Sequence, residues 1–84
     1  EQINVARNRL AGAVPPSYSN LSRLAYLDVS NNLLSGDVPA FLGRLKNLAL
    51  LDLSNNSFSG EIPASLCALP SLTYLSLSRN TRTI

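Results

Sequence analysis

The chain has 84 residues, of which 45% are hydrophobic and 14% are charged, and its formal net charge is +2. This length allows one domain at most, with a modest core. The charges are scattered and no apolar run approaches the roughly 20 residues of a transmembrane helix, so we expect no nucleic-acid partner, no membrane-surface binding and no membrane segment within the chain.

A repeat of 24 residues organises the sequence. Its clearest mark is an asparagine that recurs at Asn8, Asn32, Asn56 and Asn80. A fixed period of this size indicates a solenoid, in which each coil contacts only its neighbours. We predict a single solenoid over residues 1–84. Its coils would be 1–24, 25–48, 49–72 and a partial coil at 73–84.

Each coil begins with a short predicted strand. Around each Leu-x-Leu the pattern alternates with period two, which is typical of a strand with one buried face. In the second coil Leu27 and Val29 would point inward, whereas Tyr26, Asp28 and Ser30 would point outward. Equal spacing in every coil predicts a parallel, in-register sheet with strands about 4.8 Å apart. The inward strand positions are Ile3, Val5, Leu27, Val29, Leu51, Leu53, Leu75 and Leu77.

The repeated asparagine lies where the chain leaves the strand and its backbone groups lose their sheet partners. An inward amide supplies both donors and acceptors, so stacked asparagines would satisfy the bends of adjacent coils. We assign a structural rather than a ligand-binding role to this asparagine ladder, which consists of Asn8, Asn32, Asn56 and Asn80.

A glycine turn, a proline and a short return segment complete each coil. Glycine allows the turn, and proline fixes φ where no ladder bond is needed. These positions are Gly12, Gly36 and Gly60, then Pro15, Pro39 and Pro63. The return from Ala40 to Leu48 carries apolar residues every three positions, which favours a 3₁₀ turn over a full α-helix. The remaining inward positions are Leu10, Leu34, Phe58, Val14, Val38, Ile62, Tyr18, Leu42, Leu66, Leu21, Leu45, Leu69, Leu24, Leu48 and Leu72.

The third coil carries the sequence that identifies the repeat class. From Leu48 to Leu66 it follows the template Leu-x-x-Leu-x-Leu-Ser-x-Asn-x-Leu-Ser-Gly-x-Ile-Pro-x-x-Leu, with only Phe58 in a leucine position. This pattern resembles the plant-specific class of leucine-rich repeats over residues 3–80. The resemblance implies an α/β solenoid, a horseshoe segment with a concave parallel sheet, second short strands near Ser-Gly-x-Ile-Pro and mostly 3₁₀ turns on the convex side.

Two departures from the family pattern bear on the extent of the chain. Family members usually carry cysteine-paired caps at both ends, and Cys67 is the only cysteine here. The pattern also stops after Asn80, where Arg82 takes a leucine position and Ile84 replaces the turn glycine. Either the repeat array is cut there or an inserted, non-repeat segment begins. Together with a first residue other than Met, these features predict a processed or excised fragment of about three and a half coils.

The outward strand positions are our candidates for partner binding, because they form the concave surface that the resemblance implies. One column consists of Gln2, Tyr26, Leu50 and Tyr74, and the next of Asn4, Asp28, Asp52 and Ser76. Exposed aromatic residues in a contiguous patch often mark an interaction site, although isolated apolar residues on a surface are normal. A third outward column is Ala6, Ser30, Ser54 and Ser78, which is weakly compatible with an ice-binding array.

Asp28 and Asp52 should lie side by side at about the strand spacing. Paired carboxylates about 5 Å apart serve retaining glycosidases, but here both would be solvated on an open sheet without a pocket. The chain has no His and one Cys, so it cannot assemble a Ser-His or Cys-His nucleophile. We therefore expect no enzyme activity, no cofactor and no metal site.

Arginines flank the asparagine ladder at both ends. They occur in Arg7-Asn8-Arg9 and in Arg79-Asn80-Thr81-Arg82. Outward guanidinium pairs can bind a carboxylate or sulfate in bidentate fashion, and some plant peptide receptors are similar in using arginine pairs for the C-terminus of a ligand. Arg7 and Arg79 are therefore further binding candidates, and a solvated edge is the alternative.

Modification chemistry is limited to one thiol and two sequons. Cys67 falls on the convex return in the position of Ser19 and Gly43, so we expect a buried thiol, with a partner outside this fragment as the alternative. Asn20-Leu21-Ser22 and Asn55-Asn56-Ser57 are acceptors for N-glycosylation in a secreted protein.

These patterns predict a non-catalytic recognition module. The resemblance implies part of an extracellular, cell-surface or secreted plant protein that binds a peptide, hormone or protein, with a co-receptor as a further candidate partner. A secreted inhibitor of a cell-wall-degrading enzyme, of the polygalacturonase-inhibitor type, is the alternative, and a structural or ice-binding repeat is the third. A transmembrane and kinase segment in the parent gene would distinguish the receptor from the inhibitor.

Overall fold

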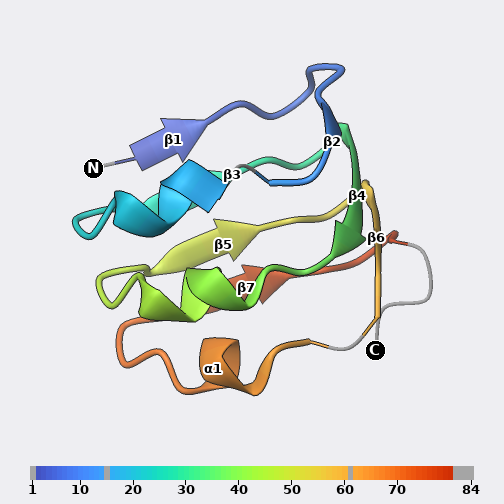
Figure 1. The fold of residues 1–84 in the computed structure, drawn as a ribbon. Coiled ribbons are helices and arrows are strands. Elements are labelled where there is room, and N and C mark those ends of the chain that lie inside the picture. Colours follow the sequence, from blue (N-terminus) through green and yellow to red (C-terminus); the bar gives the residue numbers. More distant parts are fainter. Residues whose placement is uncertain (1, 15, 61, 81–84) are drawn as a thin grey trace.

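The computed structural model describes residues 2–14, 16–60 and 62–80. Short strands and single helical turns alternate along this part of the chain (Figure 1). In chain order they are β1 (Gln2–Asn4), β2 (Ala11–Gly12), η1 (Pro16–Asn20), β3 (Tyr26–Asp28), β4 (Leu33–Asp37), η2 (Ala40–Arg44), β5 (Leu50–Asp52), β6 (Ser57–Ser59), α1 (Ala64–Cys67) and β7 (Tyr74–Ser76), where η denotes a 3₁₀ helix.

Four of the strands form one parallel sheet in the order β1-β3-β5-β7. Each residue pairs with the residue 24 positions further on, as Leu27 does with Leu51 and Leu51 with Leu75. The backbone ladder continues beyond the strands, because the amide of Val29 donates to the carbonyl of Asp52 at 3.0 Å. The predicted parallel, in-register sheet is confirmed, since only a strict period places every coil in the same register.

A second parallel sheet has the order β2-β4-β6 and lies beside the first (Figure 1). We call its outward side the lateral face. Gly12, Gly36 and Gly60 lie at or next to these strands with φ of 86°, 88° and 84°, which side-chain-bearing residues rarely adopt. The second short strands expected near Ser-Gly-x-Ile-Pro are therefore present. Pro39 and Pro63 directly precede η2 and α1. Proline has no N–H, and at these positions no sheet hydrogen bond needs one. Pro15 lies outside the described residues.

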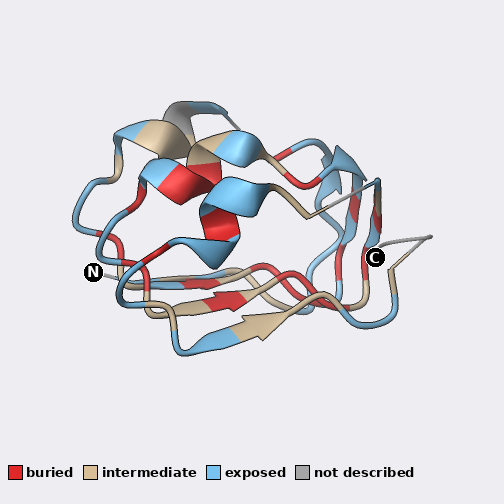
Figure 2. Ribbon diagram, turned by 90° about the horizontal axis from the view of Figure 1, so that it is seen from below, coloured by how far each residue is buried: buried red, intermediate tan, exposed pale blue. Residues whose placement is uncertain are grey.

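The helical turns lie on the opposite side from the four-stranded sheet and form the convex side (Figure 2). Two of the three are 3₁₀ helices, as predicted, whereas α1 is a single α-helical turn. None of the helices in the described part of the chain is long and apolar enough to cross a bilayer.

The core lies between the sheets and the helical turns, where buried side chains from successive coils stack. Leu27, Leu51 and Leu53 are completely buried, as are Leu42 and Phe58. Full burial of one such side chain stabilises the fold by about 1.5–3 kcal/mol. The core thus consists of the inward positions that the repeat predicts, and it is densest in the second and third coils.

The first and last coils are less completely buried than the middle ones. Ile3, Val5, Leu75 and Leu77 are only partly covered. Leu10 was expected inward but is 43% exposed. A core side chain of a solenoid is covered by the coils on both sides, whereas Leu10 is covered in this chain only by the coil that contains Leu34. The irregular positions Arg82 and Ile84 lie outside the described residues.

Candidate functional site

The outward side of the sheet β1-β3-β5-β7, which we call the concave face, presents an apolar ridge. The ridge consists of Tyr26, Leu50 and Tyr74, which pair directly with one another on adjacent strands. Tyr26 and Tyr74 are 48% and 49% exposed, and Leu50 is half-buried between them. The alternation that buries Leu27 on one side of the strand directs Tyr26 to the other, so the ridge follows from the repeat together with the residue type at one variable position.

A polar column runs beside the ridge, two residues further along each strand. It contains Asn4, Asp28, Asp52 and Ser76, and the two aspartates are direct partners in the sheet. Two residues of parallel strand span about 6.6 Å, and adjacent strands are about 4.8 Å apart. The ridge and the aspartate pair therefore form a compact patch with apolar and acidic halves.

The aspartates are less solvated than the sequence suggested, because each one also closes a local turn. Oδ1 of Asp28 accepts hydrogen bonds from the amide and the hydroxyl of Ser30, at 3.0 and 2.7 Å. Oδ1 of Asp52 accepts the same pair from Ser54, at 3.0 and 2.6 Å. Both aspartates are half-buried. The expectation that both carboxylates are solvated was therefore wrong for Oδ1 of Asp28 and for Oδ1 of Asp52.

Two members of the serine column beyond the aspartates are buried, whereas Ser78 is exposed. Ser30 and Ser54 are only 5% and 8% exposed, although both were expected to face solvent. The reason is the hydrogen bond that folds each hydroxyl onto the preceding aspartate. A flat array of exposed hydroxyls is therefore absent at these two positions.

Asparagine side chains link successive coils at the bend after each strand. Nδ2 of Asn56 donates to the carbonyls of Val29, Leu53 and Ser54 at 3.0–3.2 Å, and its Oδ1 accepts the amide of Leu34 at 3.1 Å. Asn32 and Asn80 make the corresponding bonds to the coil before each of them.

Asn8 is the exception within the asparagine ladder. It is exposed, and its Nδ2 donates only within its own coil, to the carbonyls of Val5 and Ala6. Asn8 was expected to point inward and to link two coils, but in this chain it does neither. The linking hydrogen bonds of Asn32, Asn56 and Asn80 go to the preceding coil.

The bend also contains a left-handed residue that sequence reasoning did not identify. It recurs with the same period at Arg7, Asn31, Asn55 and Arg79, with φ of 60°, 59°, 55° and 58°. Asparagine tolerates this conformation better than most residues, and its occurrence at two of the four positions was the available signal. Arg7 and Arg79 thus lie at the bend, beyond the strands. They are three strand spacings, or about 14 Å, apart, so the two arginine pairs suggested by the sequence lie at opposite ends of the bend. Arg82, the second member of the later pair, lies outside the described residues.

The remaining candidates are spread over other surfaces. Cys67 is exposed, so the expected buried thiol was wrong. The equivalent Gly43 is buried against Ser65 of the following coil, and Cys67 has no such coil over it in this chain. Asn20 ends η1 and is exposed on the convex side, whereas Asn55 is half-buried at the bend. Within the described residues no group of three or more His, Cys, Asp or Glu could hold a metal ion.

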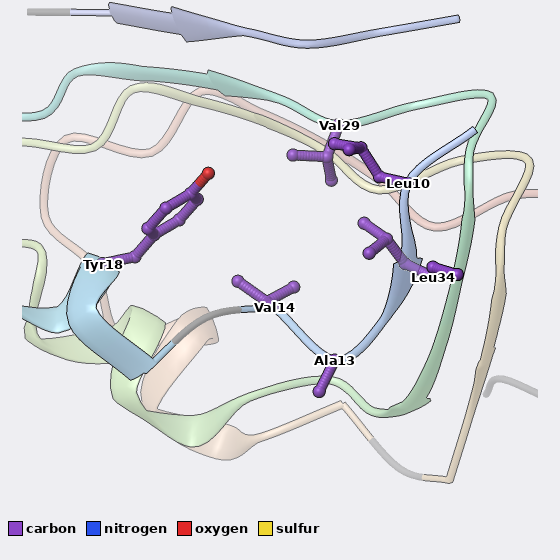
Figure 3. A pocket seen from close by; sticks show the side chains of 7 residues that line it. Leu10, Ala13, Val14, Tyr18, Val29 and Leu34 are labelled. Atoms are coloured by element: carbon purple, nitrogen blue, oxygen red, sulfur yellow. The ribbon is translucent and has the colours of Figure 1, made fainter. Parts of the chain in front are cut away.

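Two apolar features that the sequence did not suggest lie on the lateral face and between the first two coils. Leu33 on β4 is 59% exposed. A pocket of about 180 Å³ lies between the first and second coils, and Figure 3 shows Tyr18, Val14 and Val29 around it. Leu34, which also lines it, occupies the position that the larger and fully buried Phe58 fills one coil later.

Comparisons with solved structures show several plant proteins with the same fold. The chain superposes on the Arabidopsis receptor kinase HAESA, solved in complex with the peptide hormone IDA and the co-receptor SERK1, with a TM-score of 0.89 and 47% identity, over 94% of this chain and 13% of that one. For the PEPR1–AtPEP1 structure the TM-score is 0.90 with 41% identity, over 93% of this chain and 11% of that one. For a plant ice-binding protein the values are 0.91 and 40%, over 94% of this chain and 26% of that one.

The chain thus spans about a quarter or less of the length of these structures. The search of curated protein sequences gave no match. A family profile described as leucine rich repeat matches residues 22–81, which is more than half of the chain. The chain therefore belongs to the leucine-rich-repeat family, and its coils resemble those of plant receptor-kinase ectodomains.

Proposed function

We propose that this chain is a non-catalytic recognition module, part of a plant leucine-rich-repeat receptor ectodomain, and that it binds a peptide or protein on its concave face. The observation that carries the proposal is the ridge. Tyr26, Leu50 and Tyr74 are in register on three adjacent strands, and about half of the surface of each tyrosine is exposed. Contiguous exposed aromatic residues are enriched at protein interfaces.

The comparisons support the same assignment. One of the similar structures is the receptor kinase HAESA with a peptide hormone and a co-receptor, and another is PEPR1 with AtPEP1. Their leucine-rich-repeat fold is typically non-catalytic, and the ectodomain of a receptor faces the outside of the cell. We therefore propose an extracellular location, a peptide or protein ligand and a co-receptor as a further partner. In that location Asn20 would carry a glycan on the convex side, away from the ridge.

A display experiment tests the ridge directly. The immobilised chain is panned against a random heptapeptide library, and the selected peptides are measured against Tyr26→Ala, Tyr74→Ala and Leu33→Ala. The last variant is the matched control, because Leu33 is an equally exposed apolar residue on the lateral face. We expect the two tyrosine variants to weaken binding at least tenfold, as for interface anchors, and Leu33→Ala to bind like the wild type. Equal loss in all three would contradict the assignment.

Two alternatives remain distinguishable by experiment. Similarity to a plant ice-binding protein favours an assay of ice recrystallisation, in which activity at micromolar concentration would support that function. The burial of Ser30 and Ser54 argues against the serine column as the ice-binding surface. A secreted inhibitor of a cell-wall-degrading enzyme would instead reduce polygalacturonase activity, with loss of the effect in a concave-face variant.

A further inference from the structure

We infer that the concave face selects peptides that carry a lysine or arginine two residues away from an apolar side chain. This inference rests on the proposed function and specifies the ligand class of the same surface. It is carried by the position of the aspartate pair, Asp28 and Asp52, beside the ridge.

The two aspartates present free carboxylate oxygens to solvent at one place. Each Oδ1 is occupied by a serine amide and hydroxyl, whereas no described residue donates to either Oδ2. The two residues are direct partners on adjacent strands, so the free oxygens lie about one strand spacing, or 4.8 Å, apart. A cationic group placed between them would contact both carboxylates at hydrogen-bonding distance.

No charged side chain of the described residues compensates this acidic pair. The structure pairs neither carboxylate with a cation within residues 2–14, 16–60 and 62–80. The neighbours in the same column are the neutral Asn4 and Ser76, and the ridge beside it is apolar. Two like charges at this separation repel each other, and a ligand cation would relieve that repulsion. Charge complementarity therefore favours a basic ligand over a neutral or acidic one.

The spacing of the patch defines the ligand motif. Tyr26 and Asp28 lie on one face of β3 two residues apart, about 6.6 Å along the strand. An extended peptide has the same rise, so its side chains at positions i and i+2 also lie about 6.6 Å apart on one face. A peptide parallel to the strands can place its apolar side chain on Tyr26 and Leu50 and its basic side chain between the aspartates. Neighbouring positions i and i+1 point to opposite faces and cannot do both.

The experiment uses acetylated, amidated hexapeptides labelled with a fluorophore, with binding to the chain followed by fluorescence polarisation. One peptide carries leucine and lysine at positions i and i+2, a twin replaces the lysine by glutamine, and a second twin moves the lysine to i+1. Both orders of leucine and lysine are included. We expect the i,i+2 lysine peptide to bind about tenfold more tightly than either twin, since each half-exposed charge pair contributes up to about fivefold.

Variants assign that preference to the aspartates. Asp28→Asn with Asp52→Asn removes both charges but retains a side-chain oxygen that accepts the serine hydrogen bonds, so the turn remains closed. We expect this double variant to bind all three peptides equally. Asp37→Asn is the matched control, because Asp37 is exposed on the lateral face, and it should keep the wild-type preference. Raising the salt concentration from about 0.1 M to about 1 M should reduce the preference in the wild type, because the screening length falls to about 3 Å.

The outcomes separate this inference from the function on which it rests. Binding that depends on Tyr26 and Tyr74 but shows no preference for lysine over glutamine would overturn the ligand class and leave the recognition function standing. A preference that persists in the double aspartate variant would overturn the role of the pair. The comparison between twins uses the wild-type chain alone, so it decides the inference even if the double variant does not fold. No binding of any peptide by the wild type would contradict both proposals.

Discussion

The substitution Asn56→Ala should destabilise the fold through one buried amide. Asn56 links the second and third coils, and the carbonyls that it contacts retain other donors, such as Asn32 on Val29 and Asn80 on Leu53. Within the described residues, the acceptor for the buried amide of Leu34 is Oδ1 of Asn56. An unsatisfied buried donor costs about 1–3 kcal/mol and the lost bonds about 1 kcal/mol more, so the free energy of unfolding should fall by about 2–4 kcal/mol.

Urea denaturation followed by circular dichroism measures this loss. Asn8→Ala is the matched control, because Asn8 makes only two local bonds at an exposed position and its removal should cost about 1 kcal/mol or less. The reasoning would be refuted if Asn56→Ala and Asn8→Ala lowered the free energy of unfolding by the same amount.

Three further predictions concern packing and exposure. Gly43→Ala should lower the free energy of unfolding by about 1–3 kcal/mol, because a Cβ there overlaps the side chain of Ser65. In denaturation measurements a second substitution, Ser65→Gly, should restore most of the loss, whereas Ser65→Ala should not. Leu34→Phe should raise the melting temperature by filling part of the pocket between the first two coils, with a gain of about 1 kcal/mol. A lower melting temperature would show that the pocket cannot take the ring. Cys67 should react with iodoacetamide in the native chain as fast as in urea, and strong protection in the native state would contradict its exposure.

Much of the fold could be predicted from the sequence because one period specifies it four times. The alternation around Leu27 and Leu51 determined which strand residues are buried, and the spacing of 24 residues determined their register. The second strands near Gly36 and Gly60 were expected from the family resemblance rather than from the period. In a solenoid each residue meets mainly its counterparts in adjacent coils, so sequence separation translates directly into contact.

The errors arose where neighbours, rather than the repeat, decide exposure. Leu10 and Asn8 have the residue types of buried positions but lack a coil on one side in this chain. Cys67 differs from Gly43 in the same way, since no following coil covers it. A periodic pattern predicts the direction of a side chain and does not show what lies over it.

The candidate site was predicted in position but not in detail. The columns of Tyr26 and Asp28 lie where the alternation indicates. The hydrogen bonds from Ser30 and Ser54 to the aspartates could not be read from alternation, because they depend on a bend two residues beyond the strand. Those bonds bury the serines and leave one oxygen of each carboxylate free, which changes the expected ligand chemistry.

Mapping of a bound peptide by nuclear magnetic resonance tests the central claim most directly. The isotopically labelled chain would be titrated with a peptide selected by display, and the changes in amide and side-chain chemical shifts would be assigned to residues. Recognition on the concave face predicts the largest changes at Tyr26, Leu50 and Tyr74, with smaller changes at Asp28 and Asp52 and none at Leu33. Changes confined to Leu33 and the lateral face, or to the convex helical turns, would contradict the account.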